Sequence, residues 1–530
     1  MTGSALRLAA VFSAALLLAA VAPFELAAQR TFDVIIRGGR VLDGTGNPWF
    51  VADVALDGDR IAAVGDLTNA RGRREIDATG LYVAPGFIDS HSHAGGGLET
   101  EALSHARPLL AMGLTTVIIN PDGGGPIDLV AQRERLLEHG LGVNVMQLVP
   151  HGSVRRAVLG MEDRGPTADE LARMKRLVRR GMEDGAFGLS SGTFYAPGSY
   201  SESDEIIALA LIVAEYGGAY TSHPRDESNY TVGVIASAEE VIDVGRQAGI
   251  PTILTHVKAL GPPVWGYSTA IVQRISAARA EGIEVYTDQY PYAASATGLS
   301  AALLPRWAQA GGPDSLLARF GRPETMARIR DAMVDNLARR GGADRIQFRR
   351  VSGDESMEGR LLSDIARERG QDPIDVAIDL LKRGSPGIVS FNMHEADVRT
   401  LMDQPWNMTS SDGGLVPWMV GVPHPRSYGA FARKIRKYVV EEGVVGLAAA
   451  IRSMTSLPAQ VFRLADRGTL APGKAADVVV FDLERVRDVA TFTSPHALSE
   501  GMMYVFVNGE AAIDGGEFTD RRDGLTLRRH

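Results

Sequence analysis

Two histidines separated by a single residue, His91 and His93, could bind the same cation. They follow the apolar run 86–89, which is typical of a strand, and side chains at positions i and i+2 of an extended chain point to the same side. Three further residues with ligand chemistry follow other strand-like runs, namely His223, His256 and Asp412. Imidazole and carboxylate are common zinc ligands, and zinc makes water a nucleophile near neutral pH. These residue types therefore predict a metal-ligand set.

The composition limits the types of ligand that such a metal site can use. The chain has 530 residues and no cysteine, which excludes disulfides, thiolate nucleophiles and cysteine-bound metals. Any metal site must therefore use imidazole and carboxylate. The net charge is −9 and no Lys/Arg-rich block stands out, which argues against a nucleic-acid-binding protein.

Strand-like and helical runs alternate through the middle of the chain. The runs predicted as strands are 86–89, 115–119, 143–148, 186–190, 218–221, 252–255, 283–287 and 407–410. Helical stretches lie between most of them, at 167–183, 202–216 and 269–281 for example. This alternation predicts an α/β fold with parallel strands, a (β/α)8 TIM-like barrel.

The barrel gives the candidate ligands a common location. Active sites of such barrels lie at the carboxyl ends of the strands, and all five candidate residues follow strand ends. A single histidine is more often a hydrogen-bonded structural residue than a ligand, and a His-x-His pair can lie on the surface. Their shared placement favours a metal site over these alternatives.

Both ends of the mature chain show short strands separated by Gly/Asp turns, which predicts one small β-sandwich assembled from both termini. We expect it to comprise 31–84 and 465–522, with the barrel at 85–464 between them. A mixed, helical stretch at about 297–379 is expected to be an insertion that forms a lid or side lobe. The further strand-like run 388–391 does not fit the barrel count and is expected to be peripheral.

The first residues have the layout of a secretory signal peptide. Arg7 precedes an apolar run at 8–22 that Pro23 ends, and small residues suited to cleavage lie at 22–28. A leader over 1–28 predicts a secreted or periplasmic protein. An uncleaved anchor helix or a core helix is the alternative. No later segment is long and apolar enough to cross a membrane.

Several motifs resemble those of the amidohydrolase superfamily, and within it the N-acyl-D-amino-acid deacylases. The matching segments extend over nearly the whole mature chain and are 85–93, 185–192, 195–198, 223–227, 255–258, 288–292, 411–414, 424–426 and 468–477. The His-x-His pair alone marks only the superfamily. The combination of His-x-Lys, Tyr-Pro-Tyr and His-Pro-Arg is more specific to the deacylases.

The resemblance implies a role for each candidate residue. His223 and His256 would hold the tighter zinc ion, and His91 and His93 a second, weaker position. Asp412 would take the proton from the nucleophilic water and pass it to the leaving nitrogen. The α-carboxylate of the substrate would be bound by Lys258, Tyr290 and Arg426. An ammonium, a phenol and a guanidinium suit that task on chemical grounds as well, although Tyr292 could replace Tyr290 and the two cations could be surface charges.

One position departs from the family pattern. These deacylases usually place a metal-bridging cysteine after the second strand, where this chain has Asp122 in a Gly-rich loop. A carboxylate can ligate zinc and bridge two ions, so Asp122 is a candidate ligand, although it could instead form an Asx-turn. The loop before 423–426 is also longer than usual in that family.

The resulting hypothesis is metal-dependent hydrolysis of N-acyl-D-amino acids to a carboxylate and a free amino acid, with one or two Zn²⁺ ions and a small-molecule substrate. The D configuration comes from the resemblance alone, and oligomeric state is not predicted. Hydantoinases and dihydroorotases usually have a carboxylated lysine after the fourth strand, whereas 188–191 contains none. A dipeptidase remains an alternative, and a non-catalytic scaffold that has lost its metal is a second one.

Overall fold

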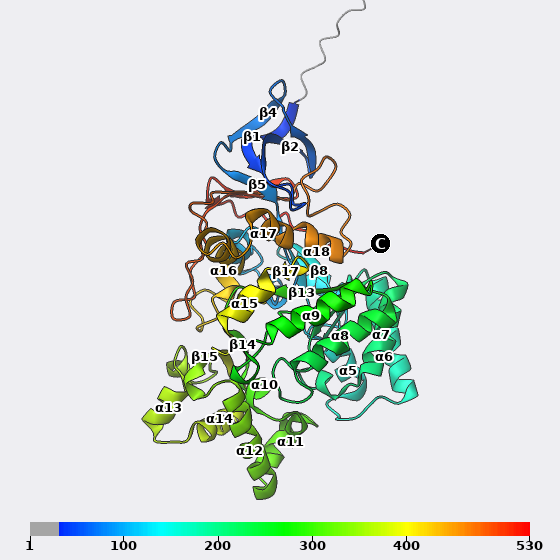
Figure 1. Ribbon diagram of the computed structural model, residues 1–530, viewed down its shortest axis with the longest axis vertical. Coiled ribbons are helices and arrows are strands. Elements are labelled where there is room, and N and C mark those ends of the chain that lie inside the picture. The colour runs from blue at the N-terminus through cyan, green and yellow to red at the C-terminus, as the bar shows by residue number, and fades with distance from the viewer. Residues whose placement is uncertain (1–30, 530) are drawn as a thin grey trace, which may run out of the picture.

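The computed structural model describes residues 31–529. The leader expected over 1–28 lies outside these residues. Figure 1 shows a small β-rich unit at the top, a body of strands and helices in the middle, and a helical lobe at the bottom. Among the described residues, no helix has the length and apolar character needed to cross a membrane.

The small β unit combines strands from both ends of the chain in one sheet of order β21-β20-β19-β18-β5-β1-β2-β3, with β4 paired to β1. Its strands are β1 (Thr31–Val41), β2 (Phe50–Asp57), β3 (Arg60–Gly65), β4 (Arg71–Asp77), β5 (Tyr82–Pro85), β18 (Val478–Phe481), β19 (Met502–Val507), β20 (Glu510–Asp514) and β21 (Glu517–Phe518). The two ends join where β5 pairs antiparallel with β18. Ile36, Val54, Val480 and Phe506 share one apolar core, so neither end could bury its apolar face alone.

The middle of the chain is the predicted parallel barrel. Its strands are β6 (Phe87–Asp89), β7 (Leu114–Ile119), β8 (Asn144–Gln147), β9 (Val149–Pro150), β10 (Gly188–Gly192), β11 (Ala219–His223), β12 (Thr252–Leu254), β13 (Val285–Gln289) and β17 (Asn407–Thr409). All their ladders are parallel, and these strands are buried on both faces, as expected when helices cover a parallel sheet. Each predicted strand run overlaps one of these strands, and β9 is a short additional strand that begins just after the run at 143–148.

The barrel strands form two separate hydrogen-bonded sheets, and other contacts join these sheets into a closed barrel. Between the last strand and the first, the Asp412 amide donates to the His91 carbonyl at 2.9 Å and Ser90 Oγ donates to the Thr409 carbonyl at 3.2 Å. On the free side of β8, the C-terminal tail pairs with Val145, whose amide donates to the Leu525 carbonyl at 2.8 Å. The end of the chain is therefore part of the barrel wall.

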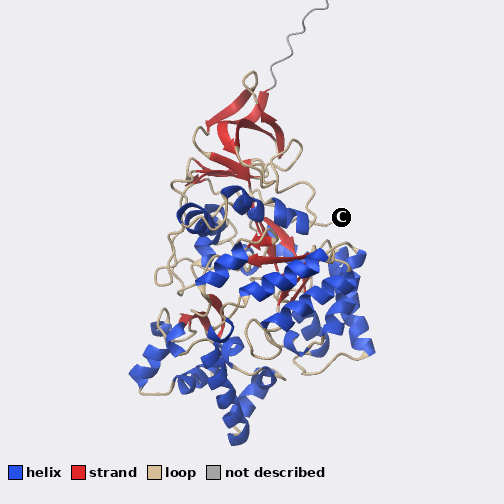
Figure 2. Ribbon diagram, viewed as in Figure 1, coloured by secondary structure: helices blue, strands red, loops and turns tan. Residues whose placement is uncertain are grey.

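Helices cover the barrel on the outside (Figure 2). They are α4 (Leu129–Leu137), α5 (His151–Leu159), α6 (Ala168–Glu183), α7 (Ser203–Glu215), α8 (Val234–Ala248), α9 (Ser268–Ala280), α15 (Glu395–Met402), α16 (Arg426–Arg433), the π-helix η6 (Lys434–Glu441), α17 (Leu447–Met454) and α18 (Ser456–Val461), with the shorter α2 (Gly95–Leu98) and α3 (Arg107–Ala111) near the first strand. Thr167 and Glu170 form a capping box at the start of α6, which explains why that helix begins where the sequence predicts.

The lobe at the bottom of Figure 1 is inserted between β13 and β17. It contains α10 (Leu299–Leu303), α11 (Pro313–Phe320), α12 (Pro323–Arg339), α13 (Leu362–Arg369), α14 (Pro373–Leu381) and the strands β14 (Ser295–Gly298), β15 (Ile346–Arg350) and β16 (Gly387–Ser390). The strands form an antiparallel sheet of order β14-β16-β15. The run at 388–391, expected to be peripheral, thus lies outside the barrel, and its strand is the central one of this sheet. The lobe reaches past 379 to Ser390 and has an apolar core of its own.

Candidate metal centre and catalytic cavity

The predicted ligands meet at the carboxyl end of the barrel. His91 and His93 follow β6, Asp122 follows β7, His256 follows β12 and Asp412 follows β17, while His223 is the last residue of β11. Because parallel strands end on the same rim, residues up to 321 positions apart in the sequence lie within one group.

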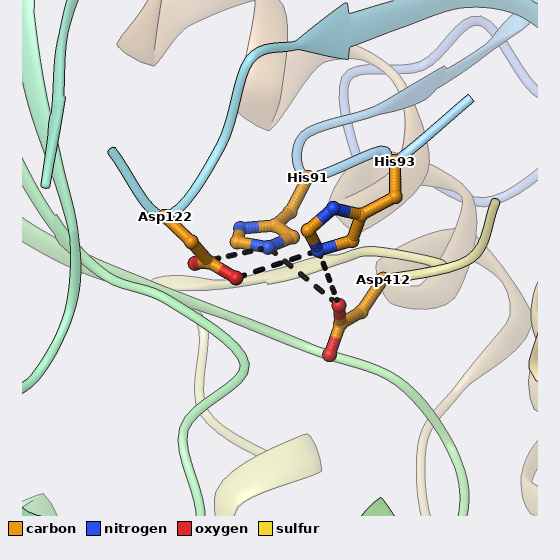
Figure 3. Close-up of side chains that lie close together, drawn as sticks. All are labelled: His91, His93, Asp122 and Asp412. Carbon is orange, nitrogen blue, oxygen red and sulfur yellow. Dashed lines mark ion pairs between the residues drawn. The ribbon is translucent and has the colours of Figure 1, made fainter. Parts of the chain in front are cut away.

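Four of these side chains form the first cluster, shown in Figure 3. Nε2 of His93 lies 3.4 Å from Oδ2 of Asp122 and 3.1 Å from Oδ1 of Asp412. Nε2 of His91 lies 3.4 Å from Oδ1 of Asp122 and 3.7 Å from Oδ1 of Asp412. The imidazoles and the carboxylates thus point their ligand atoms at a common centre.

A second cluster shares Asp122 with the first. Oδ1 of Asp122 lies 3.5 Å from Nε2 of His256 and 3.8 Å from Nδ1 of His223. One carboxylate therefore lies between two ligand groups, which is the position of a residue that bridges two metal ions. Asp122, which stands where the family pattern has a cysteine, thus directs its carboxylate into the ligand clusters rather than toward solvent.

The separations between ligand atoms fit zinc. Atoms about 2.1 Å from a tetrahedral zinc ion are about 3.4 Å from one another, close to the distances within both clusters. His91 Nε2, Asp122 Oδ1 and both ring nitrogens of His223 are buried and have no hydrogen-bond partner. Buried polar atoms without a partner are costly, and a divalent cation would supply the missing partner to His91 Nε2, Asp122 Oδ1 and the His223 nitrogen that faces Asp122.

The charges of the cluster also suit a cation. Burial raises the pKa of Asp122, but the charge of His91 and the nearby ring nitrogens of His223 and His256 hold the pKa well below its usual value. Burial lowers the pKa of His93, whereas hydrogen bonds to Asp122 and Asp412 raise it to about 9. The carboxylates thus favour a positive charge beside them, which a metal cation would supply.

A buried ion pair behind the metal ligands was missed as a functional element by sequence reasoning. Glu227 accepts a hydrogen bond from Nζ of Lys258 at 2.5 Å, and its Oε1 lies 3.1 Å from Nδ1 of His256. Nζ of Lys258 is also 2.7 Å from the same Nδ1. These contacts hold the His256 ring with Nε2 directed at Asp122. The signal present in the sequence is a glutamate four residues after His223, within the motif 223–227.

The remaining predicted substrate residues lie beside Asp412. Nη1 of Arg426 donates to Oδ2 of Asp412 at 2.7 Å, and its guanidinium lies 4.7 Å from the centre of the Tyr290 ring. Nζ of Lys258 lies 5.6 Å from that ring, so Tyr290 is placed between the two cations. Tyr290 lines a cavity that also contains Asp412 and the candidate metal ligands, whereas Tyr292 packs against His424 with ring centres 5.1 Å apart.

The ligand clusters open into a cavity of about 740 Å³. Its walls come from the Gly-rich loop at 123–125, from Phe194 and Tyr195 after β10, and from the lobe through Thr297 and Arg349. The lobe therefore forms one wall of the cavity into which the ligand clusters open. The size suits a small organic substrate.

Comparison with known proteins agrees with this geometry. Residues 74–513 match the family model described as "Amidohydrolase family". The chain is 35% identical to N-acyl-D-glutamate deacylase from Alcaligenes xylosoxydans xylosoxydans, covering 94% of this chain and 97% of that protein. This match extends along both proteins almost from end to end.

Solved structures give the same result. The crystal structure of N-acyl-D-glutamate deacylase from Bordetella bronchiseptica, complexed with zinc and a phosphonate inhibitor that mimics the tetrahedral intermediate, has a TM-score of 0.81 and 33% identity over 94% of this chain and all of that one. A D-aminoacylase studied for its binuclear metal centre has a TM-score of 0.79 and 34% identity, with the same coverage of both chains. The family match over most of the chain and these similarities together show that the chain belongs to the amidohydrolase family and is related to the D-aminoacylases.

Proposed function

We propose that this enzyme hydrolyses the amide bond of N-acyl-D-amino acids and releases a carboxylate and a free D-amino acid. The observation that supports this most directly is the position of Asp122 between two ligand clusters, beside Asp412 and at the base of a cavity that also contains Arg426. The relatives named for N-acyl-D-glutamate and D-aminoacyl substrates supply the substrate class.

The ligand clusters assign the metal to particular residues. Asp122, His223 and His256 would hold one zinc ion, and His91, His93 and Asp122 a second. When bound, zinc polarises the amide carbonyl and lowers the pKa of water. His256 is kept in place for this task by Glu227 and Lys258, and such supporting contacts commonly change metal affinity by about 10- to 100-fold.

Asp412 moves the proton. Burial raises its pKa, but the charge of Arg426 and the close contact with His93 keep the pKa well below its usual value, so the group is ionised at neutral pH. As the oxygen of water bonds to the carbonyl carbon, its proton passes to Asp412. When the C–N bond breaks, Asp412 returns that proton to the leaving nitrogen.

Arg426 orients both the aspartate and the substrate. Only one of its nitrogens is used by Asp412, so other N–H groups of the same planar guanidinium remain to bind the substrate α-carboxylate. Lys258 and the hydroxyl group of Tyr290 are the other two predicted contacts. In the present structure Lys258 is paired with Glu227 and the Tyr290 hydroxyl lies 3.7 Å from the sulfur of Met393, so both must exchange partners if they are to reach the substrate.

The test is a hydrolysis screen on the zinc-loaded enzyme, with and without chelator. The panel contains N-acetyl-D-amino acids, their L-enantiomers, and dipeptides. Chelator-sensitive release of a D-amino acid supports the proposal. Cleavage restricted to dipeptides or L-substrates would replace it with a peptidase or L-specific function, and a metal-free protein without any hydrolysis would favour the scaffold alternative.

We also propose that the chain is exported to the periplasm or the medium. The support is the leader-like sequence at 1–28, with its apolar run and small residues before the first β-strand. Cell fractionation with N-terminal sequencing tests this: a mature protein that begins near 23–29 outside the cytoplasm supports export. Full-length protein confined to the cytoplasm would contradict it.

A further inference from the structure

A β-bulge lies in the wall of the cavity, in the inserted lobe. In the ladder between β15 and β16, Phe348 pairs with Ile388 and Arg350 pairs with Gly387, so Arg349 is an extra residue without a partner. Bulges often re-aim a side chain beside an active site. Here the bulged side chain lines the cavity, while its neighbour Arg350 is exposed.

The surroundings hold Arg349 in that position. The amide of Val422 donates to the Arg349 carbonyl at 2.7 Å, which ties the bulge to the loop that leads into Arg426. On the other side, a side chain at Gly387 would place its Cβ only 3.1 Å from Nε and Nη2 of Arg349. The absence of a side chain there leaves room for the guanidinium to lie against β16.

The other cations of the cavity wall have partners or lie in solvent. Lys258 is bonded to Glu227, Arg426 to Asp412 and Arg340 to Ser390. Arg156 is exposed at the rim. Each of these side chains thus already has a protein partner or lies in solvent.

Arg349 differs from them. It is half-buried, its side chain makes no hydrogen bond or ion pair within the described residues 31–529, and its Nε is fully buried without a partner. Burial and then the charge of Arg426 lower its pKa to about 10, so it stays charged at neutral pH. A partly desolvated, unpaired guanidinium beside a substrate site is unfavourable unless something anionic binds it.

We propose that Arg349 binds a second carboxylate of the substrate, separate from the α-carboxylate held near Arg426. This inference rests on the proposed function, because it concerns the same cavity. The second carboxylate could belong to the amino-acid side chain or to the acyl group. Either would be matched by the planar fork of the guanidinium, which binds a carboxylate through two parallel hydrogen bonds.

Three substrates separate these cases: N-acetyl-D-glutamate, N-succinyl-D-leucine and N-acetyl-D-leucine. We expect the zinc-loaded enzyme to prefer one of the first two, which names the source of the carboxylate. The Arg349→Gln variant should lower kcat/KM for that substrate by about 10- to 100-fold and should lower it much less for N-acetyl-D-leucine. Arg349→Lys should recover part of the loss, and Arg350→Gln, which changes the exposed neighbour, is the matched control.

The ratio between substrates makes the result independent of how much variant protein folds. An equal loss for all three substrates, or an unchanged ratio, would overturn the role of Arg349 while leaving the proposed function intact. Preference of the wild-type enzyme for N-acetyl-D-leucine would do the same. Failure of the wild-type enzyme to hydrolyse any N-acyl-D-amino acid would instead refute the proposed function, and this inference with it.

Discussion

Nη1 of Arg426 donates a 2.7 Å hydrogen bond to Oδ2 of Asp412, so a residue expected to bind substrate is joined to the residue expected to move the proton. Both side chains are buried. The pair leaves Oδ1 of Asp412 directed at His91 and His93. If Arg426 binds the substrate and Asp412 moves the proton, as proposed, the two steps are coupled through this one contact.

Asp412→Asn removes the carboxylate that accepts the proton but keeps the shape of the side chain. We expect kcat to fall by about 10²- to 10⁴-fold, the usual contribution of general acid–base catalysis. Metal analysis should still find zinc, because Asp122, His223 and His256 form a cluster that does not include Asp412. Near-normal turnover in a zinc-loaded Asn variant would exclude Asp412 as the base.

Asp122 belongs to both ligand clusters, so its loss should affect both metal positions. We expect Asp122→Ala to weaken zinc binding by at least about tenfold, since even supporting residues contribute that much. Equilibrium dialysis with metal analysis measures the change. Asp122→Cys is the informative companion variant, because a thiolate can also ligate zinc and should restore part of the affinity. Unchanged zinc content in the Ala variant would show that Asp122 is only a turn residue.

Glu227 and Lys258 form a buried pair behind His256. Glu227→Gln should destabilise the protein, because a buried charge left without its partner costs about 3–5 kcal/mol, and it should also weaken zinc binding. We expect the double variant Glu227→Gln with Lys258→Met to recover much of the stability, though not the zinc affinity. Urea denaturation and metal analysis of the single and double variants separate the two effects, and additive destabilisation would argue against the pair.

Much of the barrel could be predicted because its signals are local. Each barrel strand overlaps a short strand-like run, and the helix at 167–183 begins at a capping box. The site residues follow from the rule that such barrels place chemistry at the carboxyl ends of their strands. The structure accordingly brings His91, His223 and Asp412 to one rim.

Other features depend on contacts that no local pattern encodes. The tail residue Leu525 bonds to Val145 across 380 positions, and the bulge at Arg349 exists only because β15 pairs with β16 across the lobe. Glu227 appears in the sequence as one more charged residue after a strand. Its buried contact with Lys258 depends on the packing of two neighbouring barrel strands, so the sequence did not reveal it.

Metal removal should be reversible if the ligand clusters are intact without metal. The ligand atoms lie within 4.8 Å of one another in each cluster, so they need little rearrangement to bind a metal ion. We expect chelation to abolish hydrolysis and added zinc to restore most of it. Circular dichroism of the chelated protein is the control: loss of secondary structure on chelation would contradict a preformed site.

Lys434 provides a test by pH. It is fully buried at the start of η6, and Nζ donates to Thr409 at 2.8 Å and to Ser453 at 2.9 Å. Burial lowers its pKa from 10.5 to about 7. Between these values the unfolded chain holds a proton that the folded chain has released, so this lysine makes the protein more stable as the pH rises from about 7 towards 10.5.

Lys434→Met keeps the side-chain length and removes the titrating group. We expect the stability of the wild-type protein relative to this variant to increase with pH, by up to about 1.4 kcal/mol per pH unit. Urea denaturation at pH 7, 8 and 9 measures that difference, and titration of other groups cancels because both proteins contain them. Lys382→Met, which removes an exposed lysine, should show no such trend. A difference between wild type and Lys434→Met that stays constant with pH would show that the buried amine keeps its proton.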